Sequence, residues 1–159
     1  MKPTRVFAAI FALALAVSVA GAARQTAPVK AAKPAAAPSA PAPILAAFEA
    51  AYPHATMKSA AAEKEDGKVV WEVESTENGL GRDLLYTPDG TVVEIEEEVP
   101  SAQLPAPVTA AVKAQYPAAR IVKGEKVTRG ATVIYELQLA GAARKSIELT
   151  PEGKPVASK

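Results

Sequence analysis

The stretch PILAAFEAAYP, residues 43–53, recurs 64 positions later as PVTAAVKAQYP, residues 107–117. Proline, tyrosine and proline align in the two stretches without a gap. Apolar side chains return every three or four residues in both, which predicts a short amphipathic helix. Proline suits the first position of a helix, and a residue that precedes proline is pushed out of the helical region. We therefore expect two helices of about ten residues, each ending before Pro53 or Pro117.

The segments that follow the two helices also repeat. VVWEV at 69–73 aligns with VIYEL at 133–137 at the same offset, and TPDG at 87–90 aligns with TPEG at 150–153 at an offset of 63. Alternation of apolar and polar residues predicts strands, and Asp66-Gly67 predicts a tight turn between two of them. A repeat of this length indicates two copies of one small domain.

The predicted fold is therefore α+β, with two tandem units that each contain a helix followed by a four-stranded antiparallel sheet. The first unit comprises residues 43–99 and the second comprises residues 104–157. We expect each helix to cover one face of its sheet and to leave the other face open. The sequence leaves open whether the two sheets join into one continuous curved sheet with the helices on one face or pack separately.

The first 42 residues have a different composition from the rest of the chain. Residues 1–22 contain a basic start, an uncharged run of 15 residues and the sequence Ala20-Gly21-Ala22, a pattern typical of a cleaved signal peptide. The alternative is a membrane anchor, but a helix of 15 residues spans only about 23 Å of a hydrocarbon core about 30 Å thick. Residues 23–42 are rich in alanine and proline and predict an extended linker. We therefore expect a periplasmic or secreted protein without a stable membrane span.

Charge and composition exclude several classes of protein. The chain has 18 basic and 17 acidic residues, a net charge of +1, and removal of Lys2 and Arg5 with the leader changes this to −1. A nucleic-acid-binding protein normally carries a basic stripe, and none is present in the sequence. The chain has no cysteine, which rules out disulfides, thiolate catalysis and metal sites with cysteine ligands.

Three segments of the second half carry a resemblance to a known family. They are LPAPV at 104–108 leading to Tyr116-Pro117, then YEL at 135–137, then IELTPEG at 147–153. Together they resemble the PepSY-like, or beta-lactamase-inhibitor-like, family of exported domains, and the first half matches the same pattern more loosely. The resemblance implies a tandem arrangement of two helix-plus-sheet units in one curved sheet. It also implies that the protein binds an envelope component or restrains a peptidase, although no inhibitory contact residue carries over.

No group of residues predicts a catalytic centre. His54 is the single histidine, it has no partner at metal-binding spacing, and we expect it in an exposed loop. Glu72 and Glu136 occupy equivalent positions and could act as a pair of catalytic carboxylates, as in glycosidases, but a polar stripe facing solvent explains them more simply. No serine lies in a nucleophile motif. We therefore predict no enzyme, no catalytic residue, no cofactor and no metal site.

The densest acidic run lies near the end of the first unit. Glu94, Glu96 and Glu98 share one face of a predicted strand, and Glu97 lies on the other. One interpretation is a solvated or edge-protecting strand face. The alternative is a divalent-cation-binding or sensing module that uses these three carboxylates as oxygen ligands.

The open face of the sheet is the predicted binding surface. Apolar and acidic side chains are mixed there, a pattern that fits a protein-binding surface and equally a packed dimer interface. We expect a non-enzymatic protein that binds a protein or peptide of the cell envelope through this face. The predicted partner-binding residues are Val70, Glu72, Glu74, Ile134, Glu136 and Gln138.

Overall fold

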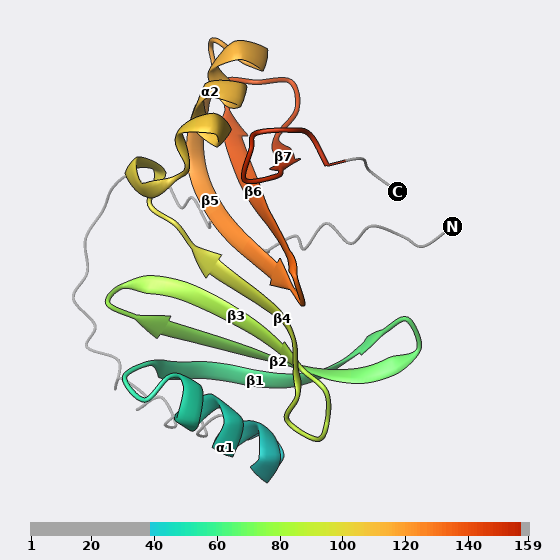
Figure 1. Cartoon of the computed structure of the whole chain (residues 1–159). Helices are drawn as coiled ribbons and strands as arrows, with labels where there is room; N and C mark the ends of the chain where they lie inside the picture. Colours follow the sequence, from blue (N-terminus) through green and yellow to red (C-terminus); the bar gives the residue numbers. More distant parts are fainter. Residues whose placement is uncertain (1–38, 157–159) are drawn as a thin grey trace, which may run out of the picture. The chain divides into compact units, whose positions relative to one another are not determined.

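The computed structural model describes residues 39–156, which form an α+β fold with two helices and a seven-stranded antiparallel sheet (Figure 1). The predicted signal peptide, residues 1–22, and most of the predicted linker, residues 23–38, lie outside the described residues. The elements follow the order α1 (Ala42–Ala51), β1 (Thr56–Glu65), β2 (Lys68–Glu77), β3 (Leu80–Tyr86), β4 (Val92–Glu98), the 3₁₀ turn η1 (Ser101–Gln103), α2 (Ala106–Gln115), β5 (Arg120–Arg129), β6 (Thr132–Ala140) and β7 (Ser146–Leu149).

The sheet is continuous, and its strands lie side by side in the order in which they occur in the sequence, β1 to β7. Successive strands are therefore antiparallel neighbours throughout, and β4 pairs with β5 at the point where the predicted units meet. The Asp66-Gly67 turn joins β1 to β2 with both residues at positive φ, 47° and 79°. This is the conformation that a two-residue hairpin turn requires. Of the two arrangements left open by the sequence, the continuous sheet is the one observed.

Proline sets the position of both helices. Pro41 and Pro105 cap α1 and α2 with extended backbone, and both helices end before Pro53 and Pro117, as predicted. Each helix buries two residues spaced i and i+4: Ile44 and Phe48 in α1, and Val108 and Val112 in α2. Each is ten residues long, and neither has the length and hydropathy that a membrane span requires.

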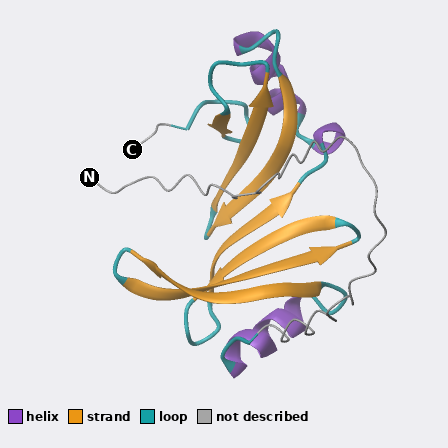
Figure 2. Cartoon of the chain, turned by 180° about the vertical axis from the view of Figure 1, so that it is seen from behind, coloured by secondary structure: helices purple, strands orange, loops and turns teal. Residues whose placement is uncertain are grey.

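Both helices pack on the same face of the sheet, which we call the helix face. Helix α1 packs against Val73, Leu84 and Tyr86, and helix α2 packs against a second group formed by Leu137, Leu139, Ile147 and Leu149. The strand register places these two groups on one face, because Leu84 pairs with Ile95, Ile95 with Thr128 and Thr128 with Val133, and Val133 alternates with Leu137 along β6. Figure 2 shows α1 beside the first strands and α2 beside the last. The opposite face, which we call the open face, has no helix on it among the described residues.

The two Thr-Pro-acid-Gly segments form turns that touch the start of each helix. Gly90 has φ +88°, and a Cβ atom added to it would lie 2.7 Å from the carbonyl oxygen of Pro43. Gly153 has φ +77° and makes the same approach to the carbonyl oxygen of Pro107. Only glycine combines this backbone conformation with so close a contact. Each glycine therefore allows its Thr-Pro-acid-Gly turn to pack directly against the start of a helix.

Two predictions about the strands were wrong. The second helix is followed by three strands instead of four, because the residues after β7 make only an isolated bridge between Leu149 and Pro155. Proline has no N–H with which to extend such a ladder. The acidic strand β4 does not protect an edge, because it is the central strand of the seven.

Candidate binding face

The strand register brings all six predicted partner-binding residues to the open face. Val70, Glu72 and Glu74 lie on β2, and Ile134, Glu136 and Gln138 lie on β6. Each alternates with residues such as Val73 or Leu137 that point into the core beneath a helix. However, β3, β4 and β5 separate the two sets, so the six residues do not form one cluster. The intervening strands contribute the residues that connect them.

The apolar members of these six residues are buried, and the polar members are at least partly exposed. Val70 and Ile134 are 6% and 7% exposed, whereas Glu74 is exposed and Glu72, Glu136 and Gln138 are partly exposed. Two further aliphatic residues of this face, Leu85 and Val127, are buried as well. The atoms that an incoming partner can reach on this face are therefore mainly carboxylate and amide atoms.

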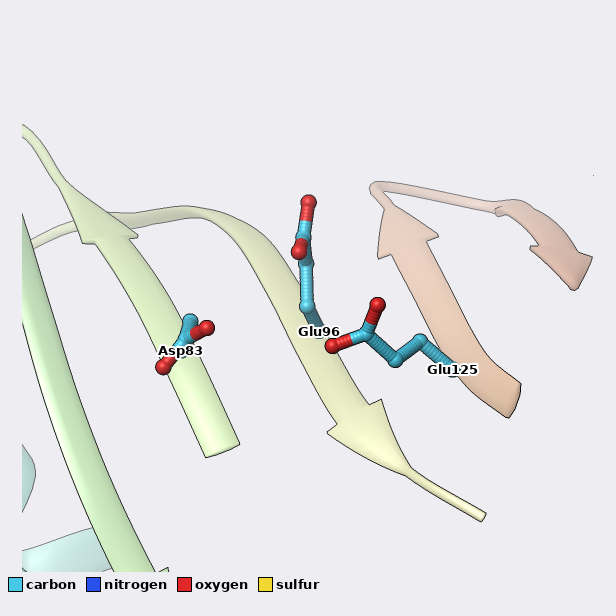
Figure 3. A group of neighbouring side chains, drawn as sticks. All are labelled: Asp83, Glu96 and Glu125. Carbon is cyan, nitrogen blue, oxygen red and sulfur yellow. The ribbon is translucent and has the colours of Figure 1, made fainter. Parts of the chain in front are cut away.

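The middle of the open face contains acids that the sequence did not single out. Asp83 on β3 and Glu125 on β5 flank Glu96 on β4, and one carboxylate oxygen from each of the three lies within 4.8 Å of the others (Figure 3). Acids also face each other directly across neighbouring strands, since Glu74 pairs with Asp83 and Asp83 pairs with Glu96. Glu74, Asp83 and Glu96 therefore form one row of acids across β2, β3 and β4. A second row lies next to it and contains Glu98, Glu125, Glu136 and Glu148.

Two basic side chains pair with acids on this face. The guanidinium of Arg129 donates two hydrogen bonds to Glu94, one of them to Oε1 at 2.9 Å, and Glu94 is 5% exposed. Lys123 Nζ lies 2.7 Å from Glu125 Oε1. Glu94 is thus buried and neutralised by Arg129, in contrast to the solvated position expected from the sequence.

Four acids of this face, Glu72, Asp83, Glu96 and Glu136, have raised pKa values. Burial raises the pKa of Glu96 from its ordinary value of 4.5 to about 8, with a further increase from a hydrogen bond with Glu94 and from the charges of Glu94, Glu125 and Glu136. Burial and the neighbouring Glu63 raise the pKa of Glu72 to about 7. Burial and nearby acids also raise the pKa values of Asp83 and Glu136. Near neutral pH this face therefore holds protons that a neutralising partner could displace.

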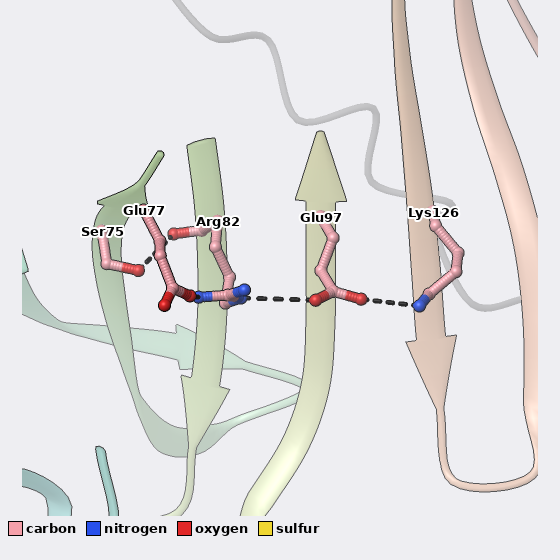
Figure 4. A network of polar contacts seen from close by, with 5 residues as sticks. All are labelled: Ser75, Glu77, Arg82, Glu97 and Lys126. Carbon is pink, nitrogen blue, oxygen red and sulfur yellow. Dashed lines mark hydrogen bonds and ion pairs between the residues drawn. The ribbon is translucent and has the colours of Figure 1, made fainter. Parts of the chain in front are cut away.

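The helix face of the same strands has the opposite arrangement of charge. Glu97 on β4 lies between Arg82 on β3 and Lys126 on β5, at 3.4 Å and 2.6 Å, and Arg82 also pairs with Glu77 (Figure 4). Burial alone would raise the pKa of Glu97, but the hydrogen bond from Lys126 and the charges of Lys126 and Arg82 lower it. Positive and negative charges therefore alternate on the helix face and do not alternate on the open face.

The structure places the remaining sequence candidates as follows. His54 is exposed in the turn after α1, as predicted. Glu72 and Glu136 both lie on the open face but have three strands between them, so they do not form a catalytic pair. Of the three acids proposed as cation ligands, Glu96 alone belongs to the Asp83–Glu96–Glu125 cluster, and Glu94 is occupied by Arg129.

Solved structures of the same fold come from several Bacteroides species. A protein inferred to be periplasmic from Bacteroides eggerthii DSM 20697 is 20% identical, with a TM-score of 0.63 over 76% of this chain and 88% of that one. A DUF2874 family protein from Bacteroides uniformis ATCC 8492 is 19% identical, with a TM-score of 0.61 over 75% and 88%. A BLIP-like protein from Bacteroides fragilis NCTC 9343 is 17% identical, with a TM-score of 0.59 over 77% and 85%.

The chain has a BLIP-like fold. At these identities the likeness concerns the fold alone, and it agrees with the beta-lactamase-inhibitor-like half of the resemblance seen in the sequence. No protein-family model and no curated protein matches the chain.

Proposed function

We propose that this chain is a non-enzymatic exported module that binds a protein or peptide of the cell envelope through its open face. The observation that carries the proposal is the asymmetry of the sheet, because two helices cover one face and no described helix covers the other. An uncovered sheet face leaves its polar groups available for the hydrogen bonds that protein interfaces contain. The BLIP-like fold and a neighbour inferred to be periplasmic support the same function.

The export signal, the linker and the duplication predicted from the sequence are part of this proposal. Residues 1–22 would direct export and be removed, and residues 23–42 would connect the mature N-terminus to the folded part. The segments 43–99 and 104–157 would be tandem PepSY-like copies. Helix starts 64 residues apart and matching Gly90 and Gly153 contacts support the duplication.

Site-specific photo-crosslinking tests the binding function. Alanine at Val70 or Ile134 would open a cavity in the sheet, so loss of binding in such a variant would be ambiguous. A photo-reactive amino acid at Gln138 instead samples the open face without removing a charge, and one at Glu49 on α1 samples the opposite side as the matched control. We expect a discrete protein adduct from position 138 in an extract of the source organism and none from position 49. Equal labelling at both positions, or no adduct at position 138, would contradict the proposal.

The cation-binding alternative keeps one supporting observation, the approach of Asp83, Glu96 and Glu125 to within 4.8 Å. Ca²⁺ takes about six to eight oxygen ligands, and this cluster brings together one carboxylate oxygen from each of only three residues. For this reason the protein-binding function is the better supported. Calorimetry with Ca²⁺ at pH 8.5, where the carboxyls are largely ionised, decides the matter. Measurable heat together with a higher unfolding temperature would favour the cation site.

A further inference from the structure

We infer that the occupant of the open face is a cationic polypeptide segment, rich in lysine or arginine, that lies across strands β2 to β6. The inference rests on the proposed function and specifies the chemistry of the partner. It follows from the distribution of charge within the sheet and from the burial of the apolar residues among the acids.

The two faces of the same three strands differ in the arrangement of their charges. Arg82 and Asp83, Glu97 and Glu96, and Lys126 and Glu125 are pairs of sequence neighbours whose side chains lie on opposite faces. On the helix face they give the ion-paired row Arg82–Glu97–Lys126. On the open face they give three acids gathered together. The difference is therefore a property of the face and not of the local composition.

This arrangement of acids carries an energetic cost. Like charges directly opposite each other in a sheet are destabilising, and the open face has such pairs at Glu74–Asp83, Asp83–Glu96 and Glu125–Glu136. The chain has nearly equal numbers of acids and bases, so composition does not force the cost. Departures from local stability rules that folding does not need are typical of functional sites. Positive charge supplied by a partner would remove the cost.

The burial of the aliphatic side chains on the open face favours a cationic partner over an apolar one. Four aliphatic residues that lie among the acids of this face, Val70, Leu85, Val127 and Ile134, are each no more than 7% exposed. An apolar partner would therefore find little accessible apolar area to bury, and carboxylates would lose hydration beneath it. Lysine and arginine, in contrast, supply positive groups at the ends of long side chains that reach the carboxylates. An anionic partner, such as a nucleic acid, would be repelled.

The width of the acidic region sets the size of the occupant. The acids extend from Glu72 and Glu74 on β2 to Glu136 on β6, across five adjacent strands. Neighbouring strands are about 4.8 Å apart, so the charged region is roughly 19 Å wide. Several basic residues of one extended segment are needed to neutralise a region of this width. We therefore commit to a polypeptide rather than a free cation.

A labelled decalysine peptide is the probe for this inference. The variant E74Q/D83N/E136Q removes three acids of the open face that no basic side chain neutralises directly among the described contacts. The matched control, E49Q/D66N/E152Q, removes three exposed acids outside this face. We expect decalysine to bind the wild type and the control within twofold of each other, and to bind the open-face variant at least tenfold more weakly. Raising the salt concentration should weaken binding to the wild type.

Three outcomes would overturn the inference. They are equal affinity of decalysine for the two variants, equal binding of decaglutamate, and displacement of decalysine by spermine at a lower concentration than unlabelled decalysine needs. The third would reassign the face to small polyamines. Because the open-face variant loses like-charge repulsion, it should unfold at a temperature no lower than the wild type. Measuring its unfolding temperature therefore tests whether misfolding causes the weak binding.

Failure of the inference is distinguishable from failure of the proposed function. If the crosslinked adduct at position 138 forms but neither decalysine nor the open-face variant reduces it, the face binds a partner that is not cationic. If no adduct forms, the protein-binding function itself is wrong.

Discussion

Arg82 and Asp83 are adjacent in the sequence and lie on opposite faces of β3 in opposite electrostatic environments. The Arg82 guanidinium pairs with Glu77 and Glu97 and lies 4.1 Å from the centre of the Tyr52 ring, at the end of α1. The Asp83 carboxylate lies within 4.8 Å of Glu96 and Glu125. One strand therefore contributes a neutralised network to the packed side of the sheet and an unbalanced group of acids to the open side.

The acidic cluster should make the protein less stable as the pH rises. The pKa of Glu96 is raised from 4.5 to about 8, so the folded chain binds this proton more tightly than the unfolded chain does. The resulting stabilisation is complete below pH 4.5 and is lost as the pH rises through about 8. We expect E96Q, which cannot ionise, to unfold at about the wild-type temperature at pH 4 and about 2–8 °C above it at pH 9.

Thermal unfolding followed by circular dichroism at both pH values measures this difference. E49Q, on the exposed side of α1, is the control and should follow the wild type at both. A wild-type advantage over E96Q at pH 9 would show that the Glu96 carboxylate is stabilising, contrary to this account.

Loss of the Arg129 side chain should leave Glu94 buried without its counter-charge. Glu94 is 5% exposed and receives two hydrogen bonds from the guanidinium. A buried acceptor that loses a charged partner typically costs about 1–3 kcal/mol. We expect R129M to lower the free energy of unfolding by that amount in urea denaturation, and E94M/R129M to recover part of the loss. R144M, at an exposed position of the β6–β7 loop, should change it by less than about 0.5 kcal/mol. An R129M loss no larger than that of R144M would argue against the pair.

Gly90 should tolerate alanine less well than Gly67 does. Both have positive φ, +88° and +79°, so alanine meets a left-handed backbone cost of about 1–2 kcal/mol at each position. At Gly90 the new Cβ would also lie 2.7 Å from the Pro43 carbonyl oxygen, whereas at Gly67 nothing lies within 4 Å. We expect G90A to be less stable than G67A by about 1–3 kcal/mol in urea denaturation. Equal losses of stability would show that the close approach of Gly90 to the Pro43 carbonyl oxygen does not restrict the side chain at position 90.

Local signals explain which parts of the fold could be predicted from the sequence. Proline before and after each helix and a Gly at positive φ in each turn act within a few residues, so α1, α2 and the turns were predictable. The regular alternation around Trp71 and Tyr135 gave β2 and β6. By contrast, β1 and β5 are interrupted by bulges at residues 57–59 and 121–123 and carry little alternation.

The centre of the candidate site could not be predicted from local signals of this kind. The approach of Asp83, Glu96 and Glu125 depends on the register between three strands, which no short stretch of sequence encodes. The sequence therefore indicated the face through Glu72 and Glu136 but missed Asp83 and Glu125. It also could not show that Val70 and Ile134 are buried there, because their exposure depends on neighbours across the sheet.

The affinity for a cationic segment should increase with pH if the open face binds one. Glu96 and Glu72, with pKa values of about 8 and about 7, are partly protonated near neutral pH and carry full negative charge only above it. Glu96 is surrounded by Glu94 on its own strand, Asp83 on β3, Glu125 on β5 and Glu136 on β6, so each proton lost strengthens the negative field of the whole group. A bound cation favours the ionised forms, and binding therefore releases protons.

Fluorescence anisotropy of labelled decalysine at constant ionic strength measures this dependence. We expect the wild-type affinity to rise about tenfold between pH 6 and pH 9, since lysine side chains, with a pKa of about 10.4, stay charged over this range. In the variant E72Q/E96Q the two groups cannot ionise, so the affinity should be lower at pH 9 and should rise less between pH 6 and pH 9 than in the wild type. An affinity that falls as the pH rises, or an equal pH dependence in the variant, would show that these two carboxyls do not contribute to the binding of the peptide.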